Sequence, residues 1–463
     1  MITPALWGGT PVPIEGRASD AAAAALATLD QRRVVAFRIS DGKHVGAIGP
    51  PEGATVERAA KLAVEIGVPL IGTVASSGAD VAEGVASLHA WGRVARAMAS
   101  ASGVVPTVLV VVGPCVSGPA LLLGIADVTV MTTDAFAYVS GPDTVRAFTG
   151  IALDHRQLGG AAQHGPRSGV ASIVAGDEDD ALVAVAHLLE YLPDHHLADP
   201  PRLDTGDPVD RDTTVAAAAV PDRSNASYDI RDVLEDVLDG GSFLELRAEH
   251  APNFVTGLGR LDGRAVGVLA NQPAQRAGAI DIEGSEKAAR FVQWCDCFNL
   301  PLVTFVDTPG FEPGKDLEWR GMIRHGAELV HAYAAATVPR LCVVLRKAYG
   351  GAYIVMDSKD LGNDWCAAWP TAEIAVMGAV GAVQILHGRQ LAADDDGAAA
   401  VKRAGLEAEY DQRFLNPYAA AERGFVDEVL AATDTRRALA TALDRLRTKQ
   451  EAVAPRRHPN TPL

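Results

Sequence analysis

The chain has 463 residues, 48% of them hydrophobic, with 41 lysine and arginine residues against 58 aspartate and glutamate residues. That length is typical of two or three domains with a sizeable core, and so large an apolar fraction excludes a mostly disordered protein. The net charge of −17 argues against a nucleic-acid binder or a membrane-surface protein, because both need a basic surface.

The cysteines and apolar segments favour a reduced, cytoplasmic protein. Five cysteines in so long a chain do not make a disulfide framework. Cys295 and Cys297 lack the two-residue gap of a zinc knuckle, so we interpret them as two thiols on one packed helix and expect no metal. The first residues, MITPALWGGTPVP, do not resemble a signal peptide, and the longest apolar run, 104–112, is too short to cross a bilayer, which needs about 20 residues.

Followed in order, the elements of the first half return in the second half at a nearly constant offset. A strand-like VVAF is followed by a helical RAAKLAVEIG, an apolar strand GVPLIGTVASSG and a turn GPCVSGPALLL. Each has a counterpart, and the shifts lie between 229 and 233, so we infer two copies of one domain. The pairs are 34–37 with 265–268, 58–67 with 287–296, 67–78 with 299–310 and 113–123 with 346–356.

Each copy alternates buried strands with amphipathic helices. The helices place apolar residues three and four positions apart, as at Ala60 and Val64 and again at Ala289 and Val292. Continuous apolar strands between helices predict an α/β fold whose sheet is covered on both faces. The segment 193–227 is rich in proline and aspartate and lacks periodicity, so we predict domains 1–192 and 228–463 joined by this linker.

The chain lacks the HExxH, G-x-S-x-G, P-loop and Rossmann motifs. Instead, both halves carry small residues where a buried strand turns into a helix, at Ser117-Gly118 and at Gly350-Gly351-Ala352. Backbone amides that converge at such a turn can form an oxyanion hole, where each donor contributes roughly 3 kcal/mol to transition-state stabilisation. The alternative is that these glycines serve only close helix–strand packing.

Other ionisable or aromatic residues give weaker signals. We interpret His164 and His325 as surface or hydrogen-bonded core residues, because isolated histidines usually are. Asp307 ends a buried strand, and we expect it to cap the following turn. Tyr349 and Tyr353 flank the second glycine turn, where one of them could wall a flat ring.

Three segments of the second half carry a specific resemblance. GAIDIEGSEKAARFVQWCDCFNLPLVTFVDTPGFEPG, RKAYGGAYIVM and AWPTAEIAVMGAVGAV together resemble the carboxyltransferase (β) subunit of biotin-dependent acyl-CoA carboxylases of the propionyl-CoA/acetyl-CoA carboxylase type. The first half resembles this family more loosely, through ASSGADVAEGVASLHAWGRV, SGVVPTVLVVVGPC and YVSGPDTVRAFTG. The resemblance implies two tandem crotonase-like ββα superhelix domains, in agreement with the duplication.

The resemblance also implies the reaction and the residues that carry it. CO₂ passes from carboxybiotin on a separate protein to the α-carbon of an acyl-CoA, and backbone amides stabilise the oxygens that gain negative charge. Gly351 and Ala352 would face the biotin ureido oxygen, and Ser117 and Gly118 the thioester oxygen. We further assign Gly350, Tyr353 and Gly310 to the biotin side.

The same resemblance predicts the partners. The chain has no biotinylation motif and no ATP-binding domain, so it needs a biotin carboxylase/biotin carboxyl carrier (α) subunit. Active sites in this family lie between the first half of one subunit and the second half of another, which implies at least a homodimer and usually a hexamer. Ile354 stands where propionyl-preferring members have Asp, which favours acetyl-CoA over propionyl-CoA and implies malonyl-CoA for fatty-acid or polyketide synthesis, although one methylene is worth only about 1 to 3 kcal/mol.

The first half departs from the family pattern, and this keeps alternatives open. Asp80 replaces an arginine, and Ser117-Gly118-Pro119 replaces Gly-Gly-Ala. The Ser117 amide keeps its role provided that φ stays negative, whereas Pro119 donates no hydrogen bond. The alternatives are a biotin-dependent decarboxylase or transcarboxylase, and a non-catalytic subunit that uses its first half only for assembly.

Overall fold

The computed structural model describes residues 7–14, 21–40, 43–223, 225–393, 396–455, 457–458 and 460–462. The prediction that the first residues are not a signal peptide concerns in part residues 1–6, which lie outside the described residues. The chain divides into two compact units: unit 1 comprises Met1–Pro201, Leu246–His250 and Cys297–Asn299, and unit 2 comprises Arg202–Glu245, Ala251–Asp296 and Leu300–Leu463. No helix in the described ranges is long and apolar enough to cross a membrane.

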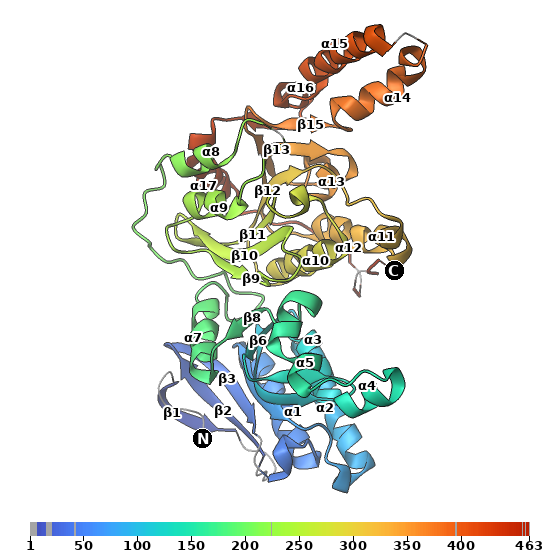
Figure 1. The fold of residues 1–463 in the computed structure, drawn as a ribbon. Coiled ribbons are helices and arrows are strands. Elements are labelled where there is room, and N and C mark those ends of the chain that lie inside the picture. Colours follow the sequence, from blue (N-terminus) through green and yellow to red (C-terminus); the bar gives the residue numbers. More distant parts are fainter. Residues whose placement is uncertain are drawn as a thin grey trace. The chain divides into compact units, whose positions relative to one another are not determined.

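Unit 1 is built on a sheet in the order β1-β2-β3-β4-β5-β6-β8, with β7 paired to β5 (Figure 1). β1, β2 and β3 pair antiparallel, and the strands from β3 onward pair parallel. The strands are β1 (Trp7–Pro13), β2 (Ala22–Leu29), β3 (Arg32–Ile39), β4 (Leu70–Ser76), β5 (Thr107–Val116), β6 (Val128–Thr132), β7 (Phe136–Tyr138) and β8 (Ile173–Ala175).

The helices of unit 1 form because small apolar residues recur along one face. In the first of them, α1, Val56, Ala59, Ala60 and Ala63 are fully buried in the core of the unit, as the apolar spacing predicts. The helices are α1 (Pro50–Ile66), α2 (Val85–Ala101), α3 (Leu122–Ile125), α4 (Pro142–Thr149), α5 (His155–Gly159), α6 (Ala161–Gln163) and α7 (Glu178–Leu189), with shorter turns η1 (Lys43–Gly46), η2 (Val81–Glu83), η3 (Gly118–Leu121) and η4 (His164–Ser168).

Unit 2 repeats this sheet in the order β9-β10-β11-β12-β13-β14-β16, with β15 paired to β13 (Figure 1). β10 and β11 pair antiparallel, and β11, β12, β13, β14 and β16 follow in parallel. The strands are β9 (Leu244–Leu246), β10 (Phe254–Leu261), β11 (Arg264–Asn271), β12 (Leu302–Thr308), β13 (Arg340–Tyr349), β14 (Trp365–Ala368), β15 (Glu373–Ala375) and β16 (Glu428–Val429).

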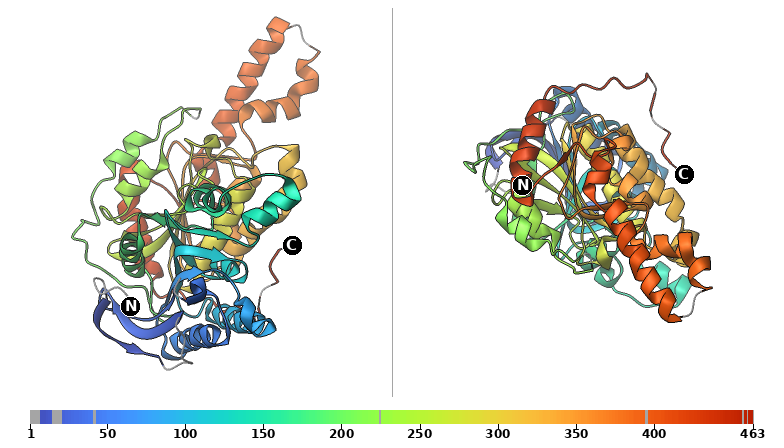
Figure 2. Two further views of the ribbon diagram at one scale, coloured as in Figure 1. Left: turned by 60° about the horizontal axis from the view of Figure 1, so that its bottom comes forward. Right: turned by 90° about the horizontal axis from the view of Figure 1, so that it is seen from above.

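Helices of unit 2 include a pair, α14 and α15, that projects away from the sheet of this unit (Figures 1 and 2). Cys295 and Cys297 lie on one helix, α10, as expected. The helices are α8 (Thr214–Ala219), α9 (Ile230–Val237), α10 (Ile282–Cys297), α11 (Lys315–Arg320), α12 (Met322–Ala335), α13 (Gly350–Val355), α14 (Ala379–Leu391), α15 (Asp396–Phe414), α16 (Pro417–Ala421) and α17 (Thr435–Leu446), with η5 (Arg276–Gly278), η6 (Lys359–Leu361) and η7 (Ala432–Asp434).

The strand registers confirm the duplication down to single residues. In unit 1, β4 and β5 pair Val74 with Val111, slip by a bulge, and then pair Ser76 with Cys115. In unit 2, β12 and β13 pair Val306 with Val344, slip at the same place, and then pair Thr308 with Ala348. Residues of β4 and β12 therefore correspond at a shift of 232, and those of β5 and β13 at a shift of 233.

The segment interpreted as a linker is more ordered than its composition suggests. Residues from Arg202 onward belong to unit 2, and α8 lies within the segment. Ala216 is fully buried in the core of unit 2, and the Arg211 guanidinium binds the carboxylates of Asp207 and Asp236. Buried alanines and ion pairs thus fix a stretch that shows no hydrophobic periodicity.

Candidate active site

The glycine turn of unit 2 is set by the backbone at the end of β13. Tyr349 pairs with Ala375 of β15, and the next residue, Gly350, has φ of +59°. A Cβ at Gly350 would lie 3.1 Å from the carbonyl oxygen of Val376, so glycine is favoured by both conformation and space. Helix α13 starts here, and its first amides, including those of Gly351 and Ala352, have no acceptor within the helix.

An apolar cavity of about 520 Å³ adjoins this turn. Gly351 leaves its mouth open, because a Cβ there would meet only the ring of Phe311, at 3.7 Å. Ile354 is 43% exposed and lines the same cavity. Sequence reasoning missed most of the wall, although three of its residues on α12, at positions 322, 326 and 330, recur at helical spacing. The lining residues are Phe311, Glu318, Met322, Ile323, Gly326, Ala327, Val330, Gly351, Ile354 and Val355.

The two other residues assigned to the biotin side differ in position. Gly310 has φ of +144° and open space around its Cα, and it directly precedes the cavity residue Phe311. Tyr353 does not line the cavity. Tyr353 is half-buried, and burial and the nearby Cys366, Cys342 and Asp360 raise the pKa of its hydroxyl.

Asp307 does not cap a turn, contrary to our expectation. It is 1% exposed, and its Oδ2 accepts a hydrogen bond from Nε of Arg346, also 1% exposed, at 3.0 Å. The second carboxylate oxygen accepts from the backbone amide of Lys347 at 3.2 Å. Burial raises the pKa of Asp307 and the Arg346 guanidinium opposes that rise. This ion pair links β12 to β13 four residues before the glycine turn. The only signal for it in the sequence was a carboxylate at the end of a strand.

A second contact holds the same turn from the side of β15. The hydroxyl of Tyr349 donates to the carboxylate of Glu373. Burial and this carboxylate raise the pKa of Tyr349, so the phenol stays protonated and keeps donating. The hydroxyl of Tyr349 therefore has a positioning role at the turn.

The matching turn of unit 1 differs in its backbone. Ser117 has φ of +62° and ψ of −133°, so the negative φ on which the role of its amide depended is not present. A non-glycine residue in such a conformation costs about 1 to 3 kcal/mol. Its amide donates to the carbonyl of Tyr138 on β7 at 2.8 Å, so this amide is occupied within the protein.

Gly118 and Pro119 complete the unit 1 turn. Gly118 starts η3, so its amide has no acceptor within that turn. A Cβ there would lie 3.0 Å from the indole ring of Trp91, which leaves no room for a side chain. Pro119, which corresponds to Ala352, is buried and has no N–H. Of the three residues, only Gly118 offers an amide to a ligand.

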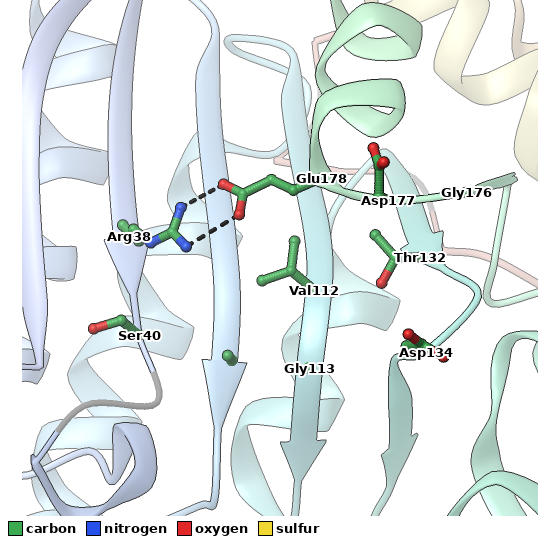
Figure 3. A pocket seen from close by; sticks show the side chains of 10 residues that line it. Arg38, Ser40, Val112, Gly113, Thr132, Asp134, Gly176, Asp177 and Glu178 are labelled. Atoms are coloured by element: carbon green, nitrogen blue, oxygen red, sulfur yellow. Dashed lines mark hydrogen bonds and ion pairs between the residues drawn. The ribbon is translucent and has the colours of Figure 1, made fainter. Parts of the chain in front are cut away.

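A polar cavity of about 270 Å³ is lined in part by Gly113 of β5, which precedes the unit 1 turn along the chain (Figure 3). Ala75 and Gly113, which line it, correspond by register to Asp307 and Arg346. The cavity thus occupies the place of the buried ion pair of unit 2. A different pair closes one side of it: the guanidinium of Arg38 on β3 binds both oxygens of the Glu178 carboxylate on α7 (Figure 3).

The remaining polar candidates have local roles. Oδ1 of Asp80 accepts from the amide of Ala82 at 2.9 Å and caps η2. Both ring nitrogens of His164 are hydrogen-bonded, to Ser168 and to the carbonyl of Ala137, which confirms its interpretation as a satisfied histidine.

His325 lies in a cluster of possible metal ligands on α10 and α12. Its Nδ1 is 2.7 Å from a carboxylate oxygen of Glu286 and 3.2 Å from one of Glu328. Nε2 lies 3.0 Å from a guanidinium nitrogen of Arg324. An arginine can only donate, so Nε2 accepts and Nδ1 carries the proton that Glu286 receives as a hydrogen bond. The cluster is therefore explained by hydrogen bonding.

Comparison with known proteins decides the family. Residues 15–461 match the model of the carboxyl transferase domain. The chain belongs to this family. It is 45% identical over 436 residues to the propionyl-CoA carboxylase carboxyltransferase subunit of Haloferax mediterranei, covering 94% of this chain and 84% of the relative. It is also 45% identical over 447 residues to the propionyl-CoA carboxylase beta chain of Saccharopolyspora erythraea, covering 94% and 82%.

A solved structure agrees over the whole chain. This structure is transcarboxylase 12S, described as a hexamer with methylmalonyl-coenzyme A bound. It superimposes with a TM-score of 0.95 at 37% sequence identity, and the match covers 99% of this chain and 91% of the transcarboxylase chain. The crotonase-like fold and the resemblance to carboxyltransferase subunits of biotin-dependent acyl-CoA carboxylases are thereby confirmed. The protein is an enzyme, a carboxyltransferase that acts on an acyl-CoA.

Proposed function

We propose that this carboxyltransferase moves CO₂ from carboxybiotin, carried by a partner protein, to the α-carbon of a short-chain acyl-CoA. The observation that carries the proposal is the Gly350-Gly351-Ala352 turn: its amides start helix α13 without acceptors in the helix, and Gly351 lines an apolar cavity. The turn at the matching place in unit 1, Ser117-Gly118, offers the amide of Gly118. Two turns suit a reaction in which two oxygens, one on each reactant, gain charge.

On the biotin side, the residues of unit 2 fit the cofactor. A cavity of about 520 Å³ lies within the usual range of small-ligand sites, and its apolar wall would keep water from a labile carboxyl group. Bound carboxybiotin supplies the CO₂ and a ureido nitrogen that can take the α-proton. Gly351 and Ala352 would direct their amides at the ureido oxygen, while Gly350 and Gly310 allow the backbone to approach the ring.

On the acyl-CoA side, unit 1 would hold the thioester. When the α-carbon loses its proton, negative charge develops on the thioester oxygen, and the Gly118 amide is placed to donate to it. Asp80, where relatives have arginine, would leave the CoA phosphates without a cation at that point. We therefore propose 1–192 as the acyl-CoA domain, 228–463 as the biotin domain and 193–227 as their connection.

The acyl group is proposed to be acetyl or propionyl. Ile354 presents an apolar side chain to the cavity, which favours acetyl-CoA and formation of malonyl-CoA. The names of the two 45% identical relatives point to propionyl-CoA, for which the product would be methylmalonyl-CoA. Both substrates are expected to react, with Ile354 setting their ratio.

We further propose that the enzyme works as a homo-oligomer with a separate biotin carboxylase/biotin carboxyl carrier subunit, in the cytoplasm. Trp319 and Ile323 are 78% and 82% exposed, and Ile323 lines the cavity. Such large apolar side chains beside a site are typical of a surface that another subunit covers. A hexamer, as named for transcarboxylase 12S, would bring unit 1 of one subunit to unit 2 of another.

A reconstituted assay tests the proposal. The purified protein is mixed with a biotinylated partner, ATP and labelled bicarbonate, and acetyl-CoA, propionyl-CoA and longer acyl-CoAs are offered in parallel. We expect acid-stable label in the product of the two short substrates. Complex formation without acid-stable label for any acyl-CoA would contradict catalysis and leave an assembly role, whereas release of CO₂ from malonyl- or methylmalonyl-CoA without net carboxylation would favour a decarboxylase.

A further inference from the structure

The two glycine turns differ in the number of amides they offer. In unit 2, Gly351 and Ala352 both lie in the first turn of α13 and carry N–H groups. In unit 1, Gly118 has one, Pro119 has none, and the amide of Ser117 donates to the carbonyl of Tyr138. An oxyanion usually takes two donors, so the unit 1 turn is one donor short.

Ser117 carries a hydroxyl at the point where the donor is missing. The residue is exposed, and its hydroxyl has no hydrogen-bond partner among the described residues. Cβ, Cα and the carbonyl carbon alone separate this hydroxyl from the Gly118 amide, so one oxygen atom can accept from both groups. Ser117 Cβ lies beside the turn that follows β4, since a Cβ built at Gly78 would be 3.4 Å from it.

The backbone at this position would suit glycine better. Gly350 has φ of +59° and Ser117 has φ of +62°, so both turns keep a positive φ although only one of them has a glycine to adopt it. A side chain retained in a strained conformation is typical of residues with a functional role.

We propose that the Ser117 hydroxyl donates a hydrogen bond to the thioester oxygen of the acyl-CoA and replaces the amide that Pro119 lacks. This inference rests on the proposed function, which assigns the acyl-CoA to unit 1. Carboxybiotin would release CO₂ when the bond between its ureido nitrogen and the carboxyl group breaks, and that nitrogen could then take the α-proton. The electron pair of the broken α-carbon–hydrogen bond would spread to the thioester oxygen and finally form the bond from the α-carbon to CO₂. Ser117 keeps its own proton throughout and stabilises the charge together with the Gly118 amide.

A double-mutant cycle on the reconstituted enzyme tests the replacement. Ser117→Ala removes the hydroxyl but keeps Cβ, and Pro119→Ala supplies the missing amide. We expect Ser117→Ala to lower kcat for acyl-CoA carboxylation by about 10²-fold with little change in KM, because one oxyanion donor is lost. In the Pro119→Ala background the same serine change should cost less than about fivefold, since the new amide supplies the second donor.

Three further measurements keep the outcome decisive. Ser117→Gly removes the hydroxyl and relieves the positive φ, so its Tm should equal or exceed that of the wild type while its kcat falls as in Ser117→Ala. Ser100→Ala, which removes an exposed hydroxyl on α2, should leave kcat unchanged. If the wild type carboxylates acyl-CoA and Ser117→Ala does so at a similar rate, or if the serine change costs equally in both backgrounds, the inference is wrong. A wild type that forms the complex without carboxylating any acyl-CoA would instead overturn the proposed function.

Discussion

Units 1 and 2 share strand order, register and even the bulge between the two central strands, yet they differ at the ends of those strands. Unit 2 has a buried ion pair, Asp307 with Arg346, behind its turn and two free amides in front of it. Unit 1 has a polar cavity at the place of the ion pair and one free amide at its turn. The duplicated backbone therefore supplies the frame, and a few residues at the strand ends decide what each frame can bind.

The two units also differ in the position of their ion pair, although they share the same strand order and register. Unit 1 has Ala75 and Gly113 in place of the ion pair, and its own pair, Arg38 with Glu178, lies between β3 and α7. The side chains of this pair are 25% and 24% exposed, against 1% and 0% for Arg346 and Asp307. The unit 1 pair is partly exposed, so water screens it and can solvate either charge when its partner is removed, whereas breaking the buried pair of unit 2 leaves a charge without a partner.

The largest effect is expected at the buried pair. Asp307→Ala leaves the Arg346 guanidinium buried without its carboxylate, which should lower the free energy of unfolding by about 3 to 5 kcal/mol. Urea denaturation measures this change. Glu178→Ala in unit 1 is the comparison variant and should cost less, about 1 kcal/mol, because its bidentate pair is partly exposed to water. Equal losses in the two variants would contradict the distinction between the units.

The next effect concerns the donors in front of the unit 2 turn. Gly351→Pro removes one amide, and since proline is tolerated in the first turn of a helix, α13 should still form. We expect carboxyl transfer to fall by about 10² to 10³-fold while the oligomer and its complex with the carrier remain intact. Product formation and size-exclusion chromatography measure the two properties. Transfer at the wild-type rate would refute an oxyanion role for this amide.

A smaller effect is expected for substrate choice. Ile354→Asp places a carboxylate at the cavity and should shift the ratio of kcat/KM from acetyl-CoA toward propionyl-CoA by roughly 10-fold. Ile354→Val, the conservative control, should change the ratio by less than about twofold. Leu121 of unit 1 corresponds to Ile354 by register and is also exposed, at 49%. A larger shift from Leu121→Asp than from Ile354→Asp would reverse the assignment of selectivity to unit 2.

Much of the fold could be predicted from the sequence, because burial imposes regular patterns. The offset of about 230 residues, the apolar strands and the helix spacing all follow from two similar cores. The partners of polar residues could not be predicted in this way. Asp307 and Arg346 lie 39 positions apart, and nothing local distinguishes a cap from an ion pair. The positive φ of Ser117 was likewise hidden, since serine ordinarily adopts negative φ.

The smallest expected effect is a pH dependence of stability that arises in unit 2 and has no counterpart in unit 1. Asp357, which follows α13, is fully buried, and burial raises its pKa to about 7 although Arg340 donates to it at 2.7 Å. Its counterpart in unit 1, by the shift of 233, is Gly124. An unfolded aspartate has a pKa of about 3.9, so between these values the folded protein holds a proton that the unfolded chain releases. The resulting stabilisation is complete below about pH 4 and is lost as the pH rises to 7.

Asp357→Asn tests this linkage, because its side chain cannot titrate and retains an oxygen for Arg340. Between pH 6 and pH 7 the free energy of unfolding of the wild type should fall by about 1 kcal/mol more than that of the variant. Urea denaturation at both pH values measures the difference, and parallel slopes would show that unit 2 gains no pH dependence from this carboxyl.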